Sequence, residues 1–347
     1  KGKMYTDKGY FIEDPDIFDA SFFGLSEDEA KSLDPQQRLL LKATWNTLED
    51  AGITQKEISG SETGVYIGLS NIDYVQSHIR SGNTQKIDQY SLTSILHSTA
   101  AGRISYFLNL TGPAITSDTA CSSSLVSLHL ACNAIQQGEC AQALAGGVNL
   151  IFGPEGSIAL SQVKALSKDG KCKTFDEKAD GYGRSEGVGM VLLKSLDNAI
   201  NNNDNILGVI KSSAINQDGR SNGLTAPNGL AQQKLIQKAL IKGNIDPNNV
   251  TYIETHGTGT PLGDPIEIQA LDKAYNQNRN ASKPLIIGSI KSNIGHTESA
   301  AGIAGFMKVL TSFKYGCIPA NLHFKNPNPL IPWNQFNVKV ADQHIDY

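Results

Sequence analysis

Short apolar runs that alternate with helical patterns constrain the fold of this chain more than any other feature. The runs are rich in Val and Ile, and the segments between them place apolar residues three and four positions apart. We expect strands at 64–69, 114–119, 143–151, 188–193, 206–212, 250–254 and 285–290, and helices at 34–51, 92–107, 122–137, 230–242, 265–275 and 300–314. Strands that are apolar on both faces and alternate with helices predict an α/β fold with parallel or mixed sheets covered on both sides.

Two internal features predict that the chain has two similar halves. Segments 114–137 and 285–314 are each a strand, a short polar turn and a helix rich in small residues. Residues 201–205 (NNNDN) form a low-complexity patch, which is either a seam between halves or an ordinary surface loop. The 347 residues also exceed the usual limit of about 250 to 300 residues for one hydrophobic core. We therefore expect one domain with an N-terminal half at about 1–204 and a C-terminal half at about 205–347.

Charge and cysteine usage argue against several functional classes. Lys and Arg number 30 against 34 Asp and Glu, and the net charge of −4 argues against a nucleic-acid partner. The five cysteines include no CxxC pair, and a chain of this size does not need disulfides, so we expect a reducing, cytoplasmic compartment. No uncharged stretch is apolar enough to span a membrane, and no His, Cys or acid cluster has metal-ligand spacing. Neither a membrane nor a metal is therefore expected.

A turn at 117–125 (SDTACSSSL) follows one expected strand and places a cysteine at the start of a helix. Open sheets bind ligands beyond the carboxyl ends of their strands, so such turns are the first candidates for a site. Leu125, Leu128, Cys132 and Ile135 recur at helical spacing and are expected to be buried, which puts Cys121 at or near the helix N-terminus. The helix dipole and free backbone N–H groups there favour a thiolate. The alternative is a buried structural cysteine.

Two further turns carry histidines. ETHGTGTP at 254–261 surrounds His256 with two glycines and three threonines, which permit close backbone approach and offer hydroxyl groups to a ligand. KSNIGHTE at 291–298 carries Lys291 and His296 ahead of a helix rich in Ala and Gly. Taken singly, each histidine could be a structural hydrogen-bonding residue and Lys291 a solvated one. A cysteine and two histidines on equivalent turns together supply a nucleophile and two imidazoles, which predicts acyl transfer through a thioester.

Other interpretations fit less well. A hydrolase is disfavoured, though not excluded, because the water it admits would discharge the acyl-cysteine. A degradative thiolase would use a second cysteine as acid and base, and Cys317 lies in no such motif. A chalcone-synthase-like enzyme would pair its cysteine with His and Asn. The non-enzymatic alternative is a catalytically silent scaffold, and the retention of Cys121, His256 and His296 argues against it.

The three turns carry a family resemblance. DTACSSSL at 118–125, THGTGTPLGDP at 255–265 and KSNIGHTE at 291–298 resemble the three signatures of the ketosynthase domain of type I polyketide synthases. Supporting stretches are DPQQRLLL at 34, AAGRISY at 100, ALAGGVN at 143, DGKCKTFD at 169, ADGYGRSEG at 179 and INQDG at 215. The resemblance covers nearly the whole chain, and the related ketosynthase of animal-type fatty acid synthases is the nearest alternative.

The resemblance implies a thiolase-like fold of two similar halves, each with a five-stranded mixed sheet, stacked as five layers of helices and sheets. It implies that Cys121 is the acylated nucleophile, that His256 and His296 assist decarboxylation of a malonyl thioester, and that Lys291 supports their hydrogen-bonded network. The positions that match contacts to a phosphopantetheine arm are Thr258 and Thr260.

The implied reaction extends a polyketide: a carrier-bound malonyl-type unit loses carbon dioxide and condenses with an acyl chain held on Cys121. No cofactor is bound directly, because the substrates ride on the phosphopantetheine of an acyl carrier protein domain. The implied partners are that carrier, an acyltransferase and other domains of the same polypeptide, and a second copy in a homodimer. Thr255 and Ser185 replace a usual Ala and Gly. The family's first strand and its last strand and turn have no counterpart between Lys1 and Tyr347, so the resemblance implies a domain that is incomplete at both ends.

Overall fold

The first sheet contains four strands among the described residues. The computed structural model describes residues 2–80, 84, 87–276 and 278–346. β1 (Thr63–Gly68) lies between β2 (Ala114–Ser117) and β3 (Gln142–Asn149) and is parallel to both, while β4 (Gly187–Lys194) pairs antiparallel with β3. The order β2-β1-β3-β4 makes a mixed sheet, as the alternation of strands and helices predicts.

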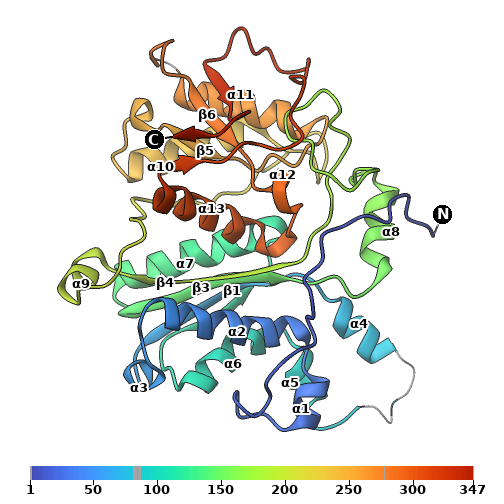
Figure 1. Cartoon of the computed structure of the whole chain (residues 1–347), viewed down its shortest axis with the longest axis vertical. Helices are drawn as coiled ribbons and strands as arrows, with labels where there is room; N and C mark the ends of the chain where they lie inside the picture. The colour runs from blue at the N-terminus through green and yellow to red at the C-terminus, as the bar shows by residue number, and fades with distance from the viewer. Residues whose placement is uncertain (1, 81–83, 85–86, 277, 347) are drawn as a thin grey trace.

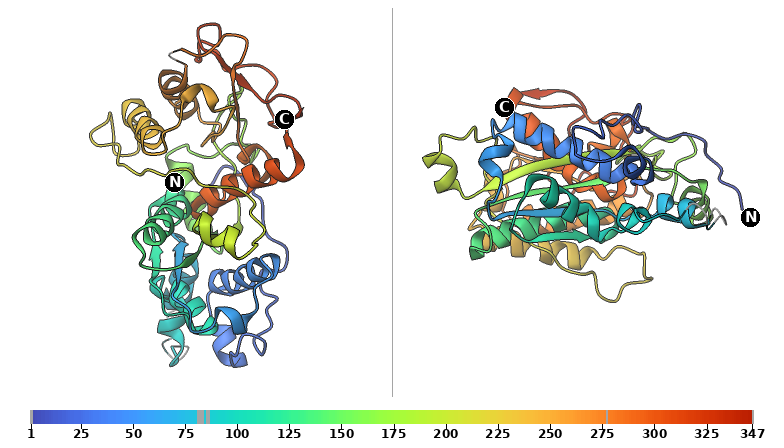
Figure 2. Two further views of the ribbon diagram at one scale, coloured as in Figure 1. Left: turned by 90° about the vertical axis from the view of Figure 1, so that its left-hand side faces the viewer. Right: turned by 90° about the horizontal axis from the view of Figure 1, so that it is seen from below.

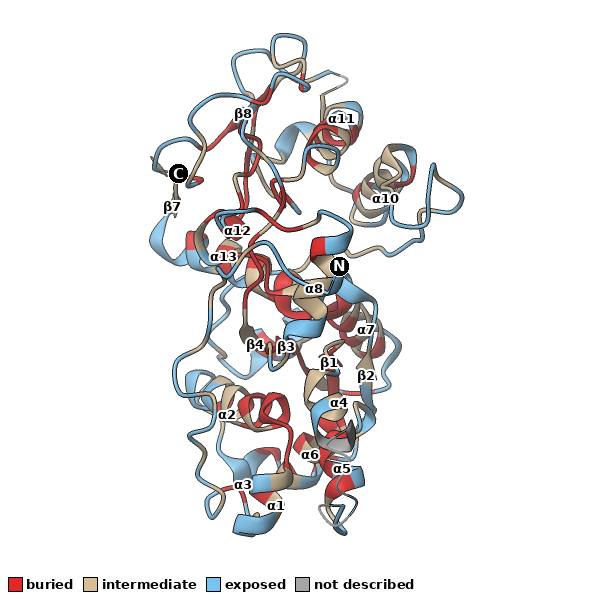
Figure 3. Cartoon of the chain, turned by 90° about the vertical axis from the view of Figure 1, so that its right-hand side faces the viewer, coloured by how far each residue is buried: buried red, intermediate tan, exposed pale blue. Residues whose placement is uncertain are grey.

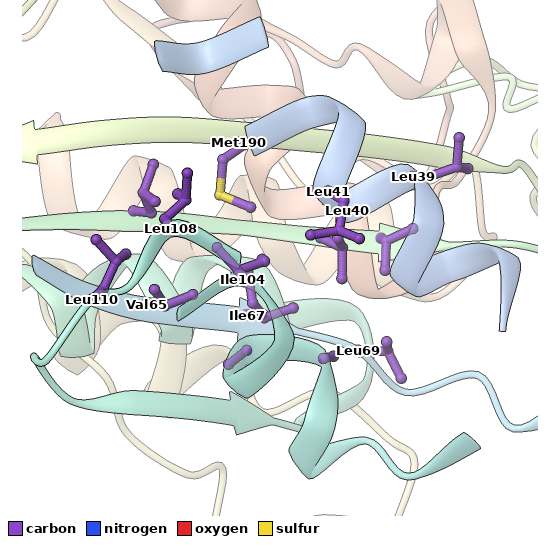
Figure 4. Packing of buried hydrophobic residues seen from close by; sticks show 14 of the residues in the cluster. Leu39, Leu40, Leu41, Val65, Ile67, Leu69, Ile104, Leu108, Leu110 and Met190 are labelled. Carbon is purple, nitrogen blue, oxygen red and sulfur yellow. The ribbon is translucent and has the colours of Figure 1, made fainter. Parts of the chain in front are cut away.

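Helices α2 (Pro35–Asp50) and α6 (Ser98–Leu108) cover the outer face of this sheet. Leu40, Val65 and Ile104 come from the two helices and β1, and all three are fully buried in one apolar cluster (Figure 4). Burial of this cluster against the sheet is the main reason that both helices form here.

Helix α2 begins and ends close to where the sequence predicts. The side chain of Asp34 accepts a hydrogen bond from the Gln36 N–H at 2.8 Å, and Pro35 occupies the first helical position. The helix ends ahead of Gly52, whose φ of +66° turns the chain away.

The single helix expected at 92–107 is broken in two. α5 (Ser91–Ile95) ends at Leu96, which has an extended backbone, and α6 then begins at Ser98. The carbonyl groups of Ser94 and Leu96 accept hydrogen bonds from Nε2 of the buried Gln37 at 3.2 and 3.3 Å. Gln37 thus satisfies carbonyl groups at the break, which apolar spacing alone does not reveal.

Helices α7 (Ser123–Gln137) and α13 (Ala301–Tyr315) lie between the two sheets (Figure 1). α7 packs on β1 and β3, and α13 packs against α7 and β4. The two helices approach closely because Gly302 has no side chain: a Cβ there would lie 2.4 Å from Leu125 Cγ. Leu128 is buried as expected, but Cys132 and Ile135 are only half-buried and Leu125 is 48% exposed.

The second sheet contains β5 (Tyr252–Glu254), β6 (Leu285–Gly288) and β8 (Val338–Val340), all parallel, in the order β5-β6-β8. α10 (Gly229–Lys242) and α11 (Gly263–Tyr275) cover its outer face, and buried apolar side chains of α11 and β6 fill the space between them. Helix, sheet, helix, sheet and helix thus follow one another along the long axis (Figures 1 and 2). The five layers implied by the resemblance are confirmed.

The strand content differs from the expectation in two respects. The sheets contain four and three strands among the described residues, where the resemblance implies five in each. Segment 206–212, expected to be a strand, forms no ladder with any described segment, and Ile206, Leu207 and Val209 are exposed. An apolar run predicts burial, but a strand also needs a partner backbone, and no segment within the described ranges supplies one.

The remaining elements are short. They are α1 (Glu27–Ser32), α3 (Gln55–Ile58), α4 (Asp73–Arg80), α8 (Pro154–Gln162), α9 (Leu196–Asn201), α12 (Lys291–Ile294), the 3-10 turns η2 (Ala120–Ser122), η3 (Pro247–Asn249) and η4 (Glu298–Ala300), and the antiparallel pair β7 (Cys317–Ile318) and β9 (Ile345–Asp346). Figure 3 shows that burial concentrates along the sheets and the helices that face them. Within the described ranges, no helix combines the length and apolar content needed to cross a bilayer, and no three His, Cys, Asp or Glu side chains gather as metal ligands would.

Candidate active site

The turn that carries Cys121 follows β2 and is held in a strained conformation. Ala120 has a φ of +53°, a left-handed value uncommon for residues other than glycine. Asp118 Oδ1 accepts the Ala120 N–H at 3.0 Å. Ser123 Oγ accepts the Thr119 N–H at 2.9 Å and donates to the Ala120 carbonyl at 2.7 Å. The small polar residues around Cys121 thus hold the turn that presents it at the start of α7.

Two glycines bring the start of α7 against the sheet. A Cβ at Gly68, the last residue of β1, would lie 2.4 Å from the backbone nitrogen of Ser124, and one at Gly147 of β3 would lie 2.8 Å from Ser124 Cβ. These separations are shorter than van der Waals contact, so both positions require glycine. The close approach fixes the position of Cys121 relative to the strand ends.

The loop that carries His256 follows β5 and is held by two acids of α11. Glu267 accepts the backbone N–H groups of His256 and Gly257 through its two carboxylate oxygens, at 2.7 and 2.9 Å. Asp264 accepts the N–H of Gly259 at 3.1 Å. Gly257 and Gly259 have φ values of +43° and +78°, so the loop depends on glycine at both positions. Sequence reasoning missed Glu267, although Asp264 lies inside the second signature.

Lys291 and His296 follow β6, and a short hydrogen-bond ladder positions His296. Its N–H donates to the Gly183 carbonyl at 2.8 Å, and its carbonyl accepts the Ser185 N–H at 3.0 Å. The Nδ1 atom of His296 accepts the Glu298 N–H at 3.0 Å. Nδ1 is therefore unprotonated in the neutral ring, and the proton lies on Nε2.

These turns bring four of the expected site residues together. The rings of His256 and His296 lie 5.5 Å apart between centroids, at an angle of 86°. The buried Lys291 is close enough for its charge to lower the pKa values of Cys121, His256 and His296. η2, which holds Cys121, packs against η4, which follows His296. The site thus combines a cysteine from the first half of the chain with three residues from the second.

Thr258 and Thr260 lie on the same loop as His256. Their hydroxyl oxygens are 3.2 Å apart, and Thr260 Oγ1 also accepts the Gly263 N–H at 3.2 Å. Thr258 is buried and Thr260 is half-buried. The hydroxyl pair therefore links the His256 loop to the first residue of α11.

Both histidines are held neutral. Burial lowers the pKa of His296 well below its usual value near 6.5, and the charges of Lys291 and Arg184 lower it further. The surrounding protein and the charge of Lys291 also lower the pKa of His256. The His256 side chain is nevertheless exposed to solvent, which weakens the lowering there. At neutral pH the two rings are imidazoles, each with one N–H to donate.

The pKa of Cys121 does not follow the sequence-based expectation. Burial raises the pKa of the thiol and the carboxylate of Glu298 raises it further, whereas Lys291 lowers it. Desolvation outweighs the favourable position at the start of α7, so the resting group is a neutral thiol. Acylation of this group requires a proton acceptor.

A buried charge network that sequence reasoning missed ties β5 to the neighbouring helices. Glu254 pairs with Lys308 at 2.8 Å, accepts the Tyr252 hydroxyl at 2.6 Å and accepts the Ile290 N–H at 2.5 Å. Its charge also raises the pKa of Lys291, which burial lowers. Glu254 stands directly before the second signature, but nothing in the local pattern shows that it reaches α12 and α13.

Comparison with known proteins places these features in a family. Residues 1–199 match the family model described as beta-ketoacyl synthase, N-terminal domain, and residues 207–325 match beta-ketoacyl synthase, C-terminal domain. The chain is 46% identical over 342 residues to the polyketide synthase GfsA of Streptomyces halstedii, a match that covers 99% of this chain and 4% of that protein. It is 44% identical over 346 residues to the pikromycin polyketide synthase component PikAII of Streptomyces venezuelae, covering 100% of this chain and 9% of that protein.

A solved structure agrees with the observed layers. The oxazolomycin ketosynthase domain OzmH KS7 of Streptomyces albus matches with a TM-score of 0.93 at 40% identity, covering 100% of this chain and 60% of that one. The chain spans less than a tenth of the length of the two curated relatives. Because the two family models together cover most of its length, the chain belongs to the beta-ketoacyl synthase family, among the ketosynthase domains of type I polyketide synthases.

Proposed function

We propose that the protein extends a polyketide by decarboxylative Claisen condensation, with Cys121 holding the growing chain. First, an acyl group moves from a carrier thioester to Cys121 Sγ, and the carrier thiol leaves with a proton. Second, a malonyl-type unit loses carbon dioxide, and its carbanion attacks the acyl carbon. That attack breaks the bond to Sγ and forms the β-ketoacyl carrier thioester. The placement of Cys121 beside two neutral imidazoles carries the proposal.

The neutral state of the histidines suits both half-reactions. A thiol whose pKa is raised by burial needs a nearby base, and a neutral imidazole can accept its proton during acyl transfer. During decarboxylation negative charge develops on the thioester oxygen of the malonyl unit. The Nε2–H of His296 and an N–H of His256 would donate to that enolate oxygen, and the charge of the buried Lys291 favours it.

The proposed partners follow from the family. Substrates would arrive on the phosphopantetheine of an acyl carrier protein, with the hydroxyl groups of Thr258 and Thr260 contacting the arm. An acyltransferase and further domains of the same polypeptide would supply the malonyl unit. We propose no directly bound cofactor, a cytoplasmic location, a homodimer, and a division of the domain near residues 204 and 205. The relatives are polyketide synthases many times longer than this chain, which supports a multidomain setting.

The alternative functions are less well supported. A ketosynthase of an animal-type fatty acid synthase would share the chemistry, but the relatives described above are polyketide synthases. A silent scaffold would not need Cys121, His256 and His296 in one place with both rings held neutral.

Two assays on the full-length protein separate the proposed roles. Cys121→Ala removes the only atom that can hold the acyl group, so acyl loading should vanish while carbon dioxide release from a malonyl carrier survives. His296→Ala or His256→Ala should leave loading substantial, because one imidazole remains, while decarboxylation falls by about 10²-fold or more. Cys132→Ala, on the helix that follows Cys121, is the matched control and should retain both activities. Loss of loading with intact carbon dioxide release in His256→Ala would show that His256 is the base for Cys121, and the assignment would be wrong.

A further inference from the structure

We propose that Arg184 is a positioning residue of the ketosynthase site: by binding both carboxylate oxygens of Glu298 it fixes the ring of His296 and screens the reacting groups from the charge of Glu298. This proposal rests on the proposed function, because it assumes that His296 takes part in decarboxylation. Neither Arg184 nor Glu298 is among the site residues that the sequence predicts.

The contact is a buried, two-pronged ion pair. Arg184 Nε donates to Glu298 Oε1 at 2.6 Å, and Nη2 donates to Oε2 at 3.0 Å. The third nitrogen, Nη1, donates to Ser157 Oγ at 2.9 Å, which ties the guanidinium to α8. The two charged side chains are only 6% and 20% exposed. A planar guanidinium that makes two parallel hydrogen bonds holds a carboxylate in one orientation, which a lysine cannot do.

The pair acts on the backbone that holds His296. Glu298 has a left-handed φ of +44°, a strained value for this residue type, and its N–H is the donor to His296 Nδ1. On the other side, the residues flanking Arg184 pair with the His296 backbone through the Gly183 carbonyl and the Ser185 N–H. The segment around Arg184 therefore holds His296 at two points. It bonds the His296 backbone directly, and through Glu298 it positions the ring nitrogen Nδ1.

The pair also sets the local charge. The groups that act on His296 are Lys291 from α12, His256 from the loop after β5, and Arg184 from the segment beside it. The ring of Tyr182 lies 4.9 Å from that of His296, Glu298 follows His296 in η4, and η4 packs against η2, which holds Cys121. Glu298 raises the pKa of Cys121, and Arg184 lowers the pKa of His296. Without Arg184, the unpaired carboxylate would favour a neutral thiol, and the loss of the cation would favour a protonated imidazole. The Nδ1 atom of a protonated ring can no longer accept the Glu298 N–H that positions it.

Charge and geometry can be separated by three variants of the full-length protein. Arg184→Met leaves Glu298 unpaired, and we expect decarboxylation of a malonyl carrier to fall about 10²-fold because His296 is misplaced. The acid limb of its pH profile should move up by about one pH unit, because His296 protonates more readily. The double variant Arg184→Met with Glu298→Gln removes both charges. The acid limb of its pH profile should therefore return toward the original position, while its rate of decarboxylation stays low. Arg184→Lys keeps the positive charge, so the acid limb of its pH profile should stay where it is in the original protein. Its rate of decarboxylation should be intermediate.

A measurement independent of activity accompanies the assays. Deuterium exchange at the C2 carbon of histidine, followed by mass spectrometry against pH, reports the pKa of His296 itself. The midpoint should rise in Arg184→Met and return in the double variant. If Arg184→Met does not fold, Arg184→Lys and Glu298→Gln carry the same test. An unchanged midpoint together with a rate within twofold of the original would overturn the proposal.

Arg103→Met is the matched control. Arg103 pairs with Glu29 at 2.7 Å with side chains 11% and 21% exposed, but it connects α6 to α1 in the outer layer. It should lower the melting temperature as much as Arg184→Met and leave the rate of folded protein within twofold. An equal loss of the decarboxylation rate in both variants would show that Arg184 only stabilises the fold. If His296→Ala retains decarboxylation, the proposed function fails; if it abolishes decarboxylation while Arg184→Met has no effect, only this inference fails.

Discussion

At the scale of single residues, the strain in the nucleophile turn lies on Ala120 and not on Cys121. A left-handed backbone costs a residue such as alanine about 1 to 2 kcal/mol, and two side chains on either side, Asp118 and Ser123, hold it. Cys121 itself is left free of that cost and keeps its sulfur at the start of α7. The arrangement separates the residue that bends the chain from the residue that reacts.

The neutral, enclosed His296 predicts a pH-dependent stability. Its pKa is lowered in the folded state, so the unfolded state binds more protons once the pH falls below about 6.5. His296→Gln removes this titration. Between pH 7 and pH 5 the free energy of unfolding of the original protein should therefore fall faster than that of the variant, by up to about 1.4 kcal/mol per pH unit. Urea unfolding at pH 7, 6 and 5 measures the difference, and parallel curves for the two proteins would contradict it.

The sequence identifies these residues but not their protonation. Cys121, His256, Lys291 and His296 are each predicted from a polar turn after a strand, and the structure places them together. The start of a helix predicts that the thiol favours its ionised form. Burial reverses that direction, and burial depends on segments far away in the sequence, such as the one around Glu298. Arg184 escapes prediction for the same reason, because its partner lies 114 residues further along the chain.

At the scale of elements, α11 does more than cover the second sheet. Its first two turns supply Asp264 and Glu267, which accept backbone N–H groups from the loop that carries His256. Burial raises the pKa of Asp264 to about 7, so the loop is held by an acid whose ionised form is disfavoured by desolvation. The helix therefore anchors the active-site loop from the outer layer of the molecule.

Glu267→Gln tests this anchoring. An amide has one oxygen to accept with, so one of the two backbone N–H groups of His256 and Gly257 loses its partner. We expect a loss of about 1 to 3 kcal/mol in the free energy of unfolding, together with slower decarboxylation. Thermal unfolding and carbon dioxide release measure the two effects. Glu57→Gln, which changes an exposed carboxylate that caps α3, is the control and should alter neither; equal losses in both variants would show that α11 has no special role.

Elements are predictable where local signals and tertiary contacts agree. Helix α2 has its cap, its first-turn proline and its terminal glycine in sequence, and its bounds follow from them. The break between α5 and α6 depends on Gln37, which lies on another helix, so periodicity cannot locate it. Segment 206–212 has the composition of a strand but lacks a neighbour among the described segments with which to pair. In both cases a distant backbone or side chain decides the outcome.

At the scale of the whole molecule, β2 leaves one edge of the first sheet open. β2 pairs with β1 on one side and with no described strand on the other, and Ile115 is 43% exposed. An apolar edge of this kind invites pairing with another chain. A two-fold related copy would cover it with the same edge, in agreement with the proposed homodimer.

Ile115→Lys tests the dimer. A charged side chain at an open edge opposes edge-to-edge pairing, so the variant should sediment as a monomer at micromolar concentration where the original protein is a dimer. Ile241→Lys, at an exposed position on the outer face of α10, is the control and should leave the dimer intact. Sedimentation velocity distinguishes the species, and a dimer that persists in Ile115→Lys would move the interface elsewhere.

The division of the site between the two halves has a consequence for recombination. Cys121 and Arg184 precede the patch at 201–205, whereas His256, His296 and Glu298 follow it. A chimaera joined at this patch would inherit its nucleophile from one parent and its imidazoles from the other, and α13 of one parent would pack on α7 and β4 of the other. The ion pair between Arg184 and Glu298 would then join residues of different ancestry. Compatibility between two parental ketosynthases therefore depends on that pair and on the packing of α13, in addition to the contacts with substrate.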